Sequence, residues 1–292
     1  MATDTGTTDY RVVVSVADPD HVGQLMRTAL DVARDRDGDV FVVSVVGESR
    51  SSPFWVFRDE VIKAEFSGDR RELLDRAIDA AEGTGIDVDG RLAVADSVAS
   101  GILTAATDCD ADAILMGWHA RRHSDILMGH IVDDVVASAP CDVLVEKIGP
   151  TADGVETVLL PAGPGAHTTL AAGVSRAIAR ANDARVDVLR VVAPDAADET
   201  REEAETLVAE AASAVGDVAT TTNVVEGEDV TETLVSAAEE RDVTVVGGGG
   251  RGRLRRVVVG STARTVGQRA ETTVIVATHS QGPRSWLARR LS

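Results

Sequence analysis

The chain carries the same series of segments twice, and this internal repeat limits the folds that it can adopt. In each half, short runs of β-branched and aliphatic residues alternate with alanine-rich stretches whose apolar residues recur at helical spacing. The runs in the first half are RVVVSVAD (11–18), DVFVVSVVGE (39–48), RLAVAD (91–96), DAILMG (112–117) and CDVLVEK (141–147). Those in the second half are TVLLPAG (157–163), RVDVLRVVAP (185–194), TTTNVVEGE (220–228), DVTVVG (242–247) and TTVIVAT (272–278). Apolar runs of strand length between helices predict short, buried, parallel strands.

We therefore predict an α/β fold of two tandem domains, each a five-stranded parallel sheet with helices on both faces. The predicted domains are residues 1–148 and 155–280, joined by a linker that contains Gly, Pro and Asp. A surplus of residues at 51–71 makes the first half longer. The last segment, 281–292, is a short amphipathic tail, too short to anchor stably in a membrane, and we expect it to dock on its own domain.

The charge balance argues against nucleic acid as a partner. Asp and Glu total 48 against 29 Lys and Arg, a net charge of −19, and the only lysines are Lys63 and Lys147. Non-specific nucleic-acid binding needs a basic face, which this composition does not supply. An acidic, lysine-poor composition is typical of cytoplasmic proteins of halophilic archaea, where salt screens the self-repulsion.

The cysteines and the apolar segments indicate the cellular compartment in which we expect the protein. Cys109 and Cys141 form no CxxC pair, which excludes a disulfide or zinc framework and fits a reducing compartment. No apolar run reaches the roughly 18 residues of a membrane span. The polar start MATDTGTTDY has no apolar segment of a secretory signal. We expect a cytoplasmic protein without stable membrane insertion and without a metal site.

The stretch VVGGGGRGRLRRVVVGST (245–262) carries the strongest functional signal. Glycine lets the backbone enter positive φ and approach a ligand closely, and the start of a helix offers N–H groups and a positive dipole end. Together these features favour an anion, usually phosphate. A Walker loop is excluded because it needs Gly-Lys-Ser/Thr, which this stretch does not contain. A dinucleotide-binding fingerprint is disfavoured because it needs an acidic residue at the end of the next strand, and this chain has none there. A flexible loop before a helix is the remaining structural alternative.

The spacing G-x2-G-x9-G-S in this stretch resembles the ATP-binding signature of the universal stress protein A family. The order of strands and helices resembles that family in each half, so the resemblance covers nearly the whole chain as two tandem copies. It implies an adenine nucleotide alpha hydrolase-like, or Rossmann-like, fold. It also implies a regulatory stress-response module that binds ATP or a related adenine nucleotide, with or without Mg²⁺. No catalytic constellation is evident, so we expect no enzyme activity beyond slow ATP hydrolysis.

The resemblance also assigns roles to positions in the second half. Those implied to surround the phosphates are Gly247, Gly250, Gly260 and Ser261, with the backbone N–H groups of Thr262 and Ala263. Those implied to line the nucleoside and base pocket are Val246, Val191, Pro161, Ala162 and Gly163. Gly163 stands where the family often has an aspartate, which weakens base recognition. Pro161 and Val191 are equally compatible with a plain turn and core role.

The first half departs from this motif. Gly117 holds the first glycine position, but Ala120 replaces the second, and Gly129 arrives one residue early with His130 in place of the hydroxyl. We therefore predict a degenerate site there and one nucleotide per chain.

Two other functions stay open. One is a nucleotide-independent protein-interaction module, favoured by the missing acid at Gly163. The other is a regulatory partner of a membrane transporter. The family resemblance further implies an intramolecular pseudo-dimer that pairs 141–147 with 272–278, with a further homodimer as an option.

Overall fold

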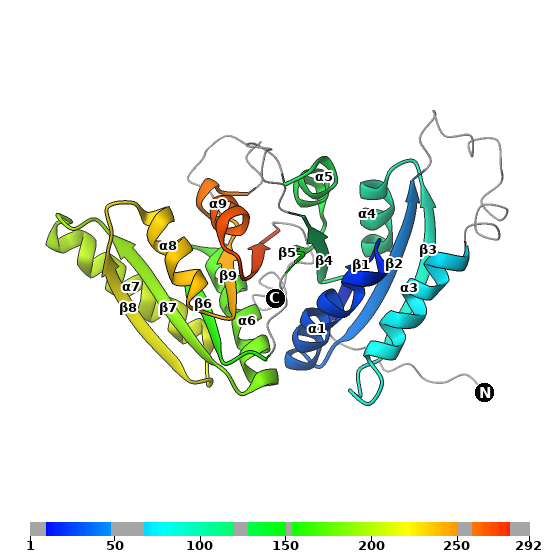
Figure 1. Cartoon of the computed structure of the whole chain (residues 1–292), viewed down its shortest axis with the longest axis horizontal. Helices are drawn as coiled ribbons and strands as arrows, with labels where there is room; N and C mark the ends of the chain where they lie inside the picture. Colours follow the sequence, from blue (N-terminus) through cyan, green and yellow to red (C-terminus); the bar gives the residue numbers. More distant parts are fainter. Residues whose placement is uncertain (1–9, 48–66, 120–127, 150–153, 250–258, 281–292) are drawn as a thin grey trace. The chain divides into compact units, whose positions relative to one another are not determined.

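The computed structural model describes residues 10–47, 67–119, 128–149, 154–249 and 259–280. These residues fall into two compact units, which divide after Leu115. Figure 1 labels the helices and strands of both units. The prediction of an α/β fold built from two tandem repeats is confirmed. No helix in the described ranges is both long enough and apolar enough to cross a membrane.

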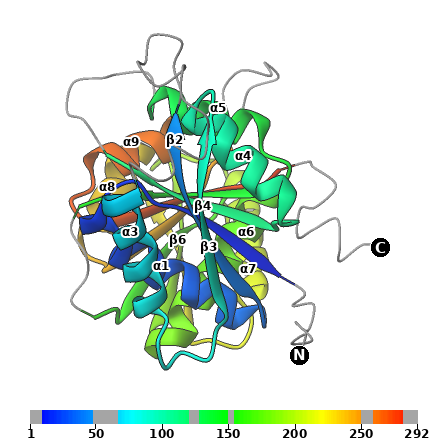
Figure 2. The ribbon, with the colours of Figure 1, turned by 90° about the vertical axis from the view of Figure 1, so that its right-hand side faces the viewer.

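The first unit is a parallel sheet with strand order β3-β2-β1-β4. Its elements are β1 (Arg11–Ser15), α1 (Pro19–Asp35), β2 (Asp39–Gly47), α3 (Ser67–Ala80), β3 (Val88–Ala95), α4 (Val98–Asp108) and the start of β4 (Ala113–Trp118). Helices α1 and α3 pack against each other on one face of the sheet, and α4 lies on the other (Figure 2). The right-handed crossovers that parallel strands prefer would produce this arrangement.

The second unit is a larger sheet with strand order β5-β10-β9-β6-β7-β8. Its elements are α5 (His130–Ser138), β5 (Asp142–Lys147), β6 (Thr157–Pro161), α6 (Ala166–Asn182), β7 (Arg185–Val192), α7 (Asp198–Val215), β8 (Thr220–Glu226), α8 (Val230–Glu239), β9 (Val243–Gly247), α9 (Ser261–Arg269) and β10 (Thr273–Thr278). Helices α6 and α7 pack together, as do α8 and α9. By the same crossover rule, the two pairs cover the two faces of this sheet.

One strand pair in this unit is antiparallel. Strand β5, the last of the first repeat, pairs with β10, the last of the second, and Val143 lies opposite Thr278. This is the pairing expected between 141–147 and 272–278. Six strand pairs are parallel: β1–β2, β2–β3, β6–β7, β6–β9, β7–β8 and β9–β10.

The prediction that all these strands are buried is wrong for β3 and β8, the first strand in the order of the first unit and the last in the order of the second. β3 and β8 are only partly covered, whereas β5 and β10 are buried along their whole length. An edge strand has a neighbour on one side only, so its polar residues, such as Thr221 and Thr222, meet solvent.

A matched aspartate before the fourth strand of each repeat ties that strand to the first. Asp242 accepts hydrogen bonds from the backbone N–H groups of Glu156 and Thr157, both at 2.9 Å. Asp112 accepts one from the N–H of Arg11, also at 2.9 Å. The repeat seen in the sequence is thus reproduced at the level of single hydrogen bonds.

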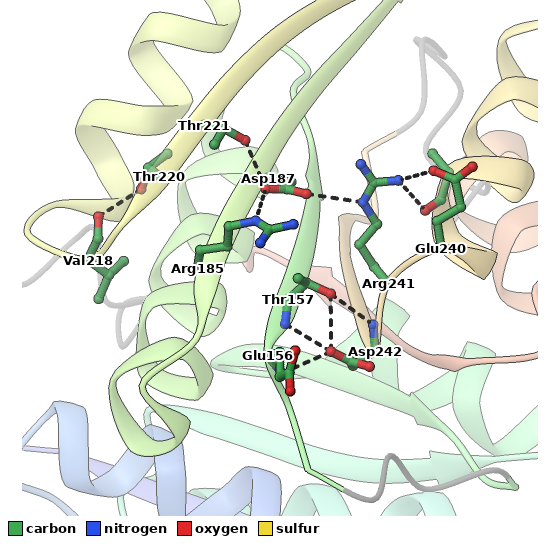
Figure 3. A network of polar contacts seen from close by, with 11 residues as sticks. Glu156, Thr157, Arg185, Asp187, Val218, Thr220, Thr221, Glu240, Arg241 and Asp242 are labelled. Atoms are coloured by element: carbon green, nitrogen blue, oxygen red, sulfur yellow. Dashed lines mark hydrogen bonds and ion pairs between the residues drawn. The ribbon is translucent and has the colours of Figure 1, made fainter.

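Asp187 in β7 is the centre of a second polar network in the second unit (Figure 3). Its carboxylate accepts hydrogen bonds from Thr221 (2.8 Å), Arg185 (3.1 Å) and Arg241 (3.1 Å). Burial raises the pKa of Asp187, but these hydrogen bonds outweigh it and hold the pKa below its usual range. The network therefore stabilises the fold above the ordinary carboxylate pKa and is lost as pH falls through the lowered value.

Asp187→Ala is expected to lower the free energy of unfolding by about 2–3 kcal/mol, because it removes a buried acceptor from three donors. Urea unfolding at pH 7 measures this loss. Asp217→Ala is the matched control, since that carboxylate is fully exposed beside Arg180 and its removal should change the midpoint little. Equal midpoints for the two variants would contradict a stabilising role for the network.

Candidate functional site

Three consecutive glycines at the end of β9, Gly247, Gly248 and Gly249, are required by close packing. A Cβ on Gly247 would lie 3.0 Å from the carbonyl carbon of His167, and one on Gly249 would lie 2.8 Å from its imidazole Cδ2. A Cβ on Gly248 would overlap the hydroxyl of Thr278. None of the three has a positive φ, so the expected left-handed backbone is not the reason for them. The fourth glycine, Gly250, lies outside the described residues.

Backbone hydrogen bonds join this loop to the start of α9. The N–H of Gly248 donates to the carbonyl of Ala277 at 2.8 Å, and the N–H of Gly260 donates to the carbonyl of Gly248 at 2.9 Å. Gly260 is the N-cap, with φ −59° and ψ 148°, and no side chain caps this helix. The N–H groups of the first helical turn, which includes Ser261, Thr262 and Ala263, have no acceptor within the helix. They form an uncapped helix N-terminus directly beside the glycines.

The loop after β6 is fixed by its neighbour β7. Ala162 donates its N–H to the carbonyl of Leu189 at 2.7 Å, and its own carbonyl accepts from Arg190 Nη1 at 3.0 Å. Gly163 donates its N–H to Thr168 Oγ1 at 3.2 Å. A Cβ on Gly163 would lie 3.3 Å from the same oxygen, so a side chain there meets one tight contact.

The predicted site residues of the strands lie at the carboxyl ends of those strands. β6, β7 and β9 are parallel, so their carboxyl ends lie at the same end of the sheet. Pro161, Val191 and Val246 are at or next to these ends. The hydrogen bonds bring Gly248 and Gly260 together directly. Val191 and Val246 are each 5% exposed, and Val191 Cγ1 packs against Gly227, so both are largely core residues.

Sequence reasoning missed a cluster of titratable residues beside this loop. Asp142, fully buried at the start of β5, accepts hydrogen bonds from His279 Nδ1 and from the N–H of Ser280, both at 2.9 Å. The backbone N–H of His279 donates to His167 Nδ1 at 3.0 Å. The signal for this cluster was the β5–β10 pairing, which places the residue after β10 opposite the first residue of β5.

The equivalent loop of the first repeat is built differently. Trp118 occupies the position that matches Gly248, and a Cβ on Gly267 of α9 would lie 2.8 Å from its ring. Gly129, the N-cap of α5, has φ 112°, unlike Gly260. Ala120 lies outside the described residues. A tryptophan side chain and a different cap conformation in the described part of this loop are consistent with a degenerate motif.

Comparisons with known proteins agree with this architecture. A universal stress protein from Archaeoglobus fulgidus DSM 4304 superposes with a TM-score of 0.66 at 16% identity, covering 92% of this chain and 98% of that one. A protein of unknown function from Pseudomonas aeruginosa PAO1 superposes with a TM-score of 0.60 at 19% identity, covering 92% of each chain. These likenesses show a shared fold.

Two further findings complete the comparison. The structure of the universal stress protein from A. fulgidus in complex with dAMP is 25% identical over 48% of this chain and 98% of that one, with a TM-score of 0.35. A search of curated proteins found no match. The model of the universal stress protein family matches residues 10–147 and again residues 154–278, so the chain belongs to that family.

Proposed function

We propose that the second repeat binds one adenine nucleotide, ATP or a close relative, and that the chain acts as a regulatory stress-response module. The observation that carries this proposal is the hydrogen bond from the N–H of Gly260 to the carbonyl of Gly248. It places the uncapped N-terminus of α9 beside residues 247–249, which we call the glycine loop. Backbone N–H groups at a helix N-terminus favour a phosphate group. The serine at the first position of α9, Ser261, adds a hydroxyl donor at the same point.

We infer a binding site from the uncapped helix N-terminus. Two histidines lie beside the loop, and each has its Nδ1 engaged: His279 Nδ1 with Asp142, and His167 Nδ1 with the backbone N–H of His279. These hydrogen bonds fix the orientation of both rings. A Mg²⁺ ion, where present, would accompany the nucleotide phosphates, because no group of three or more His, Cys, Asp or Glu in the described ranges is placed to hold a metal.

The direct test is to purify the full chain in molar KCl and identify any nucleotide released on denaturation. Isothermal titration with ATP, ADP and AMP then measures affinity and counts sites. The proposal predicts one site per chain. Two equivalent sites would mean that the first repeat also binds, and no binding of any adenine nucleotide would refute the proposal.

Ser261→Ala is expected to weaken ATP binding by about 1–2 kcal/mol, the scale of one hydrogen bond to a charged group. Ser261 is exposed at the helix start, so the fold should be unaffected. Thr262→Val tests the neighbouring hydroxyl in the same assay. An unchanged affinity for the Ser261 variant would show that the hydroxyl does not contact the ligand.

The second candidate function is a nucleotide-independent interaction module, including a regulatory partner of a transporter. The observation that favours it is Gly163, whose N–H is bonded to Thr168 and which offers no carboxylate for a base or ribose. Gly163→Asp discriminates the two functions. If the missing acid limits recognition, this variant should bind ATP more tightly than the parent chain; if the site has no nucleotide role, neither should bind.

A further inference from the structure

His167 contacts the glycine loop on one side and the end of β10 on the other. Its main chain abuts Gly247 and its imidazole Cδ2 edge abuts Gly249, at positions where a Cβ would clash. Its Nδ1 accepts the N–H of His279 at 3.0 Å. A single side chain therefore holds the glycine loop and the end of β10 in a fixed relation.

The electrostatic surroundings of His167 come from four elements. On α6, the neighbours Ala166 and Thr168 carry no charge, and the residues described at the end of β9, Gly247, Gly248 and Gly249, carry none either. From the end of β10 comes His279, whose ring lies 6.4 Å from that of His167 in an edge-on arrangement. From β5 comes Asp142, whose carboxylate already accepts from His279 and Ser280.

We propose that His167 positions the glycine loop only while its imidazole is neutral, so that mild acid loosens the loop and weakens nucleotide binding. This inference rests on the proposed function for its ligand, but its structural half concerns the loop alone. The occupied Nδ1 fixes the neutral tautomer with the proton on Nε2. A second proton would have to sit on Nδ1, where it would face the N–H of His279 and break the bond.

The ring has little room to escape that conflict. Rotation would move the Cδ2 edge, which is packed against Gly249, so relief of the conflict requires the loop to shift. The loop carries the carbonyl of Gly248 that accepts from Gly260, and the shift would therefore disturb the start of α9. The protonation state of one histidine is thus coupled to the geometry of the proposed phosphate site.

The direction of the pH effect follows from the surroundings. Burial, and secondarily the nearby His279, lower the pKa of His167, while Asp142 partly offsets them. The neutral ring therefore prevails at neutral pH, and its contribution is lost as pH falls through the lowered pKa. Binding should be constant above the ordinary histidine pKa and weaken only in mildly acidic solution.

The first experiment measures ATP affinity from pH 8 to pH 5 in the full chain and in His167→Asn. The asparagine oxygen takes the place of Nδ1 as an acceptor but cannot be protonated in this range. We expect the parent chain to lose about tenfold more affinity than the variant for each pH unit below the lowered pKa. Titration of the ATP phosphates affects both proteins equally and cancels. His130→Asn, at an exposed histidine on α5, should keep the parent profile.

The second experiment needs no ligand. Hydrogen-exchange protection of the Gly248 and Gly260 amides, corrected for intrinsic rates, should fall between pH 7.5 and pH 5 in the parent chain and stay constant in His167→Asn. Protection that is independent of pH in the parent chain, or equally dependent in both proteins, would overturn the inference. If the chain bound no nucleotide, only the proposed function would fail, and the exchange measurement would still decide whether His167 controls the loop.

Discussion

Replacing Gly260 by valine is expected to abolish ATP binding, with a loss of affinity of at least about a hundredfold, while leaving the chain folded. Gly260 has φ −59° and ψ 148°, an extended conformation that any residue can adopt. The substitution therefore imposes no backbone strain. Gly260 is buried at the start of α9 and its N–H lies 2.9 Å from the carbonyl of Gly248, so we expect a valine side chain here to crowd the proposed phosphate position.

Two glycine variants make this result interpretable. Gly247→Ala should lower both stability and binding, because its Cβ would press on the backbone of His167. Gly129→Val in the first repeat should lower stability, since φ is 112° there, but leave ATP affinity unchanged. Titration calorimetry and thermal melts of the three variants separate these effects. If the Gly129 variant lost binding while the Gly260 variant kept it, the site would lie in the first repeat and our assignment to the second would be wrong.

The glycine-rich stretch shows how far the sequence could lead. The spacing Gly247, Gly250, Gly260 and Ser261 predicted a loop that returns to the start of a helix, and the Gly260–Gly248 hydrogen bond is consistent with that. The reason for the intervening glycines could not be predicted. Gly248 and Gly249 are excluded from carrying side chains by Thr278 and His167, which lie far away in the chain and meet the loop only in the folded sheet.

The histidine cluster shows the limit more clearly. Strand propensity predicted β5 and β10, and the family resemblance predicted their pairing. Which polar side chains this pairing brings together depends on register, and one residue of slip would move Asp142 to the other face of the strand. The role of Arg190, which donates to the carbonyl of Ala162 in the loop after β6, could not be predicted either. The sequence around Arg190 shows only an apolar run that one arginine interrupts.

Thermal stability is expected to rise strongly with KCl, by about 10 °C or more in melting temperature between low and molar salt. The physical reason is the excess of 48 acidic over 29 basic side chains. Like charges at the surface repel one another over roughly 10 Å at 0.1 M salt and over only about 3 Å at 1 M. Salt also weakens exposed ion pairs such as Arg91–Asp108, but each of these contributes at most about 1 kcal/mol.

Helix α7 offers a control that separates charge screening from a general effect of salt on the hydrophobic core. Glu202, Glu203 and Glu205 lie exposed on this helix, and their replacement by glutamine removes three negative charges without touching the core. If screening is the cause, the triple variant should melt higher than the parent at low salt, and the two should converge as KCl reaches the molar range. A parent melting temperature that is flat across this range would refute the expected dependence on salt. A parallel rise in both proteins would assign the stabilisation to stronger burial of apolar surface, which does not depend on the surplus of acids.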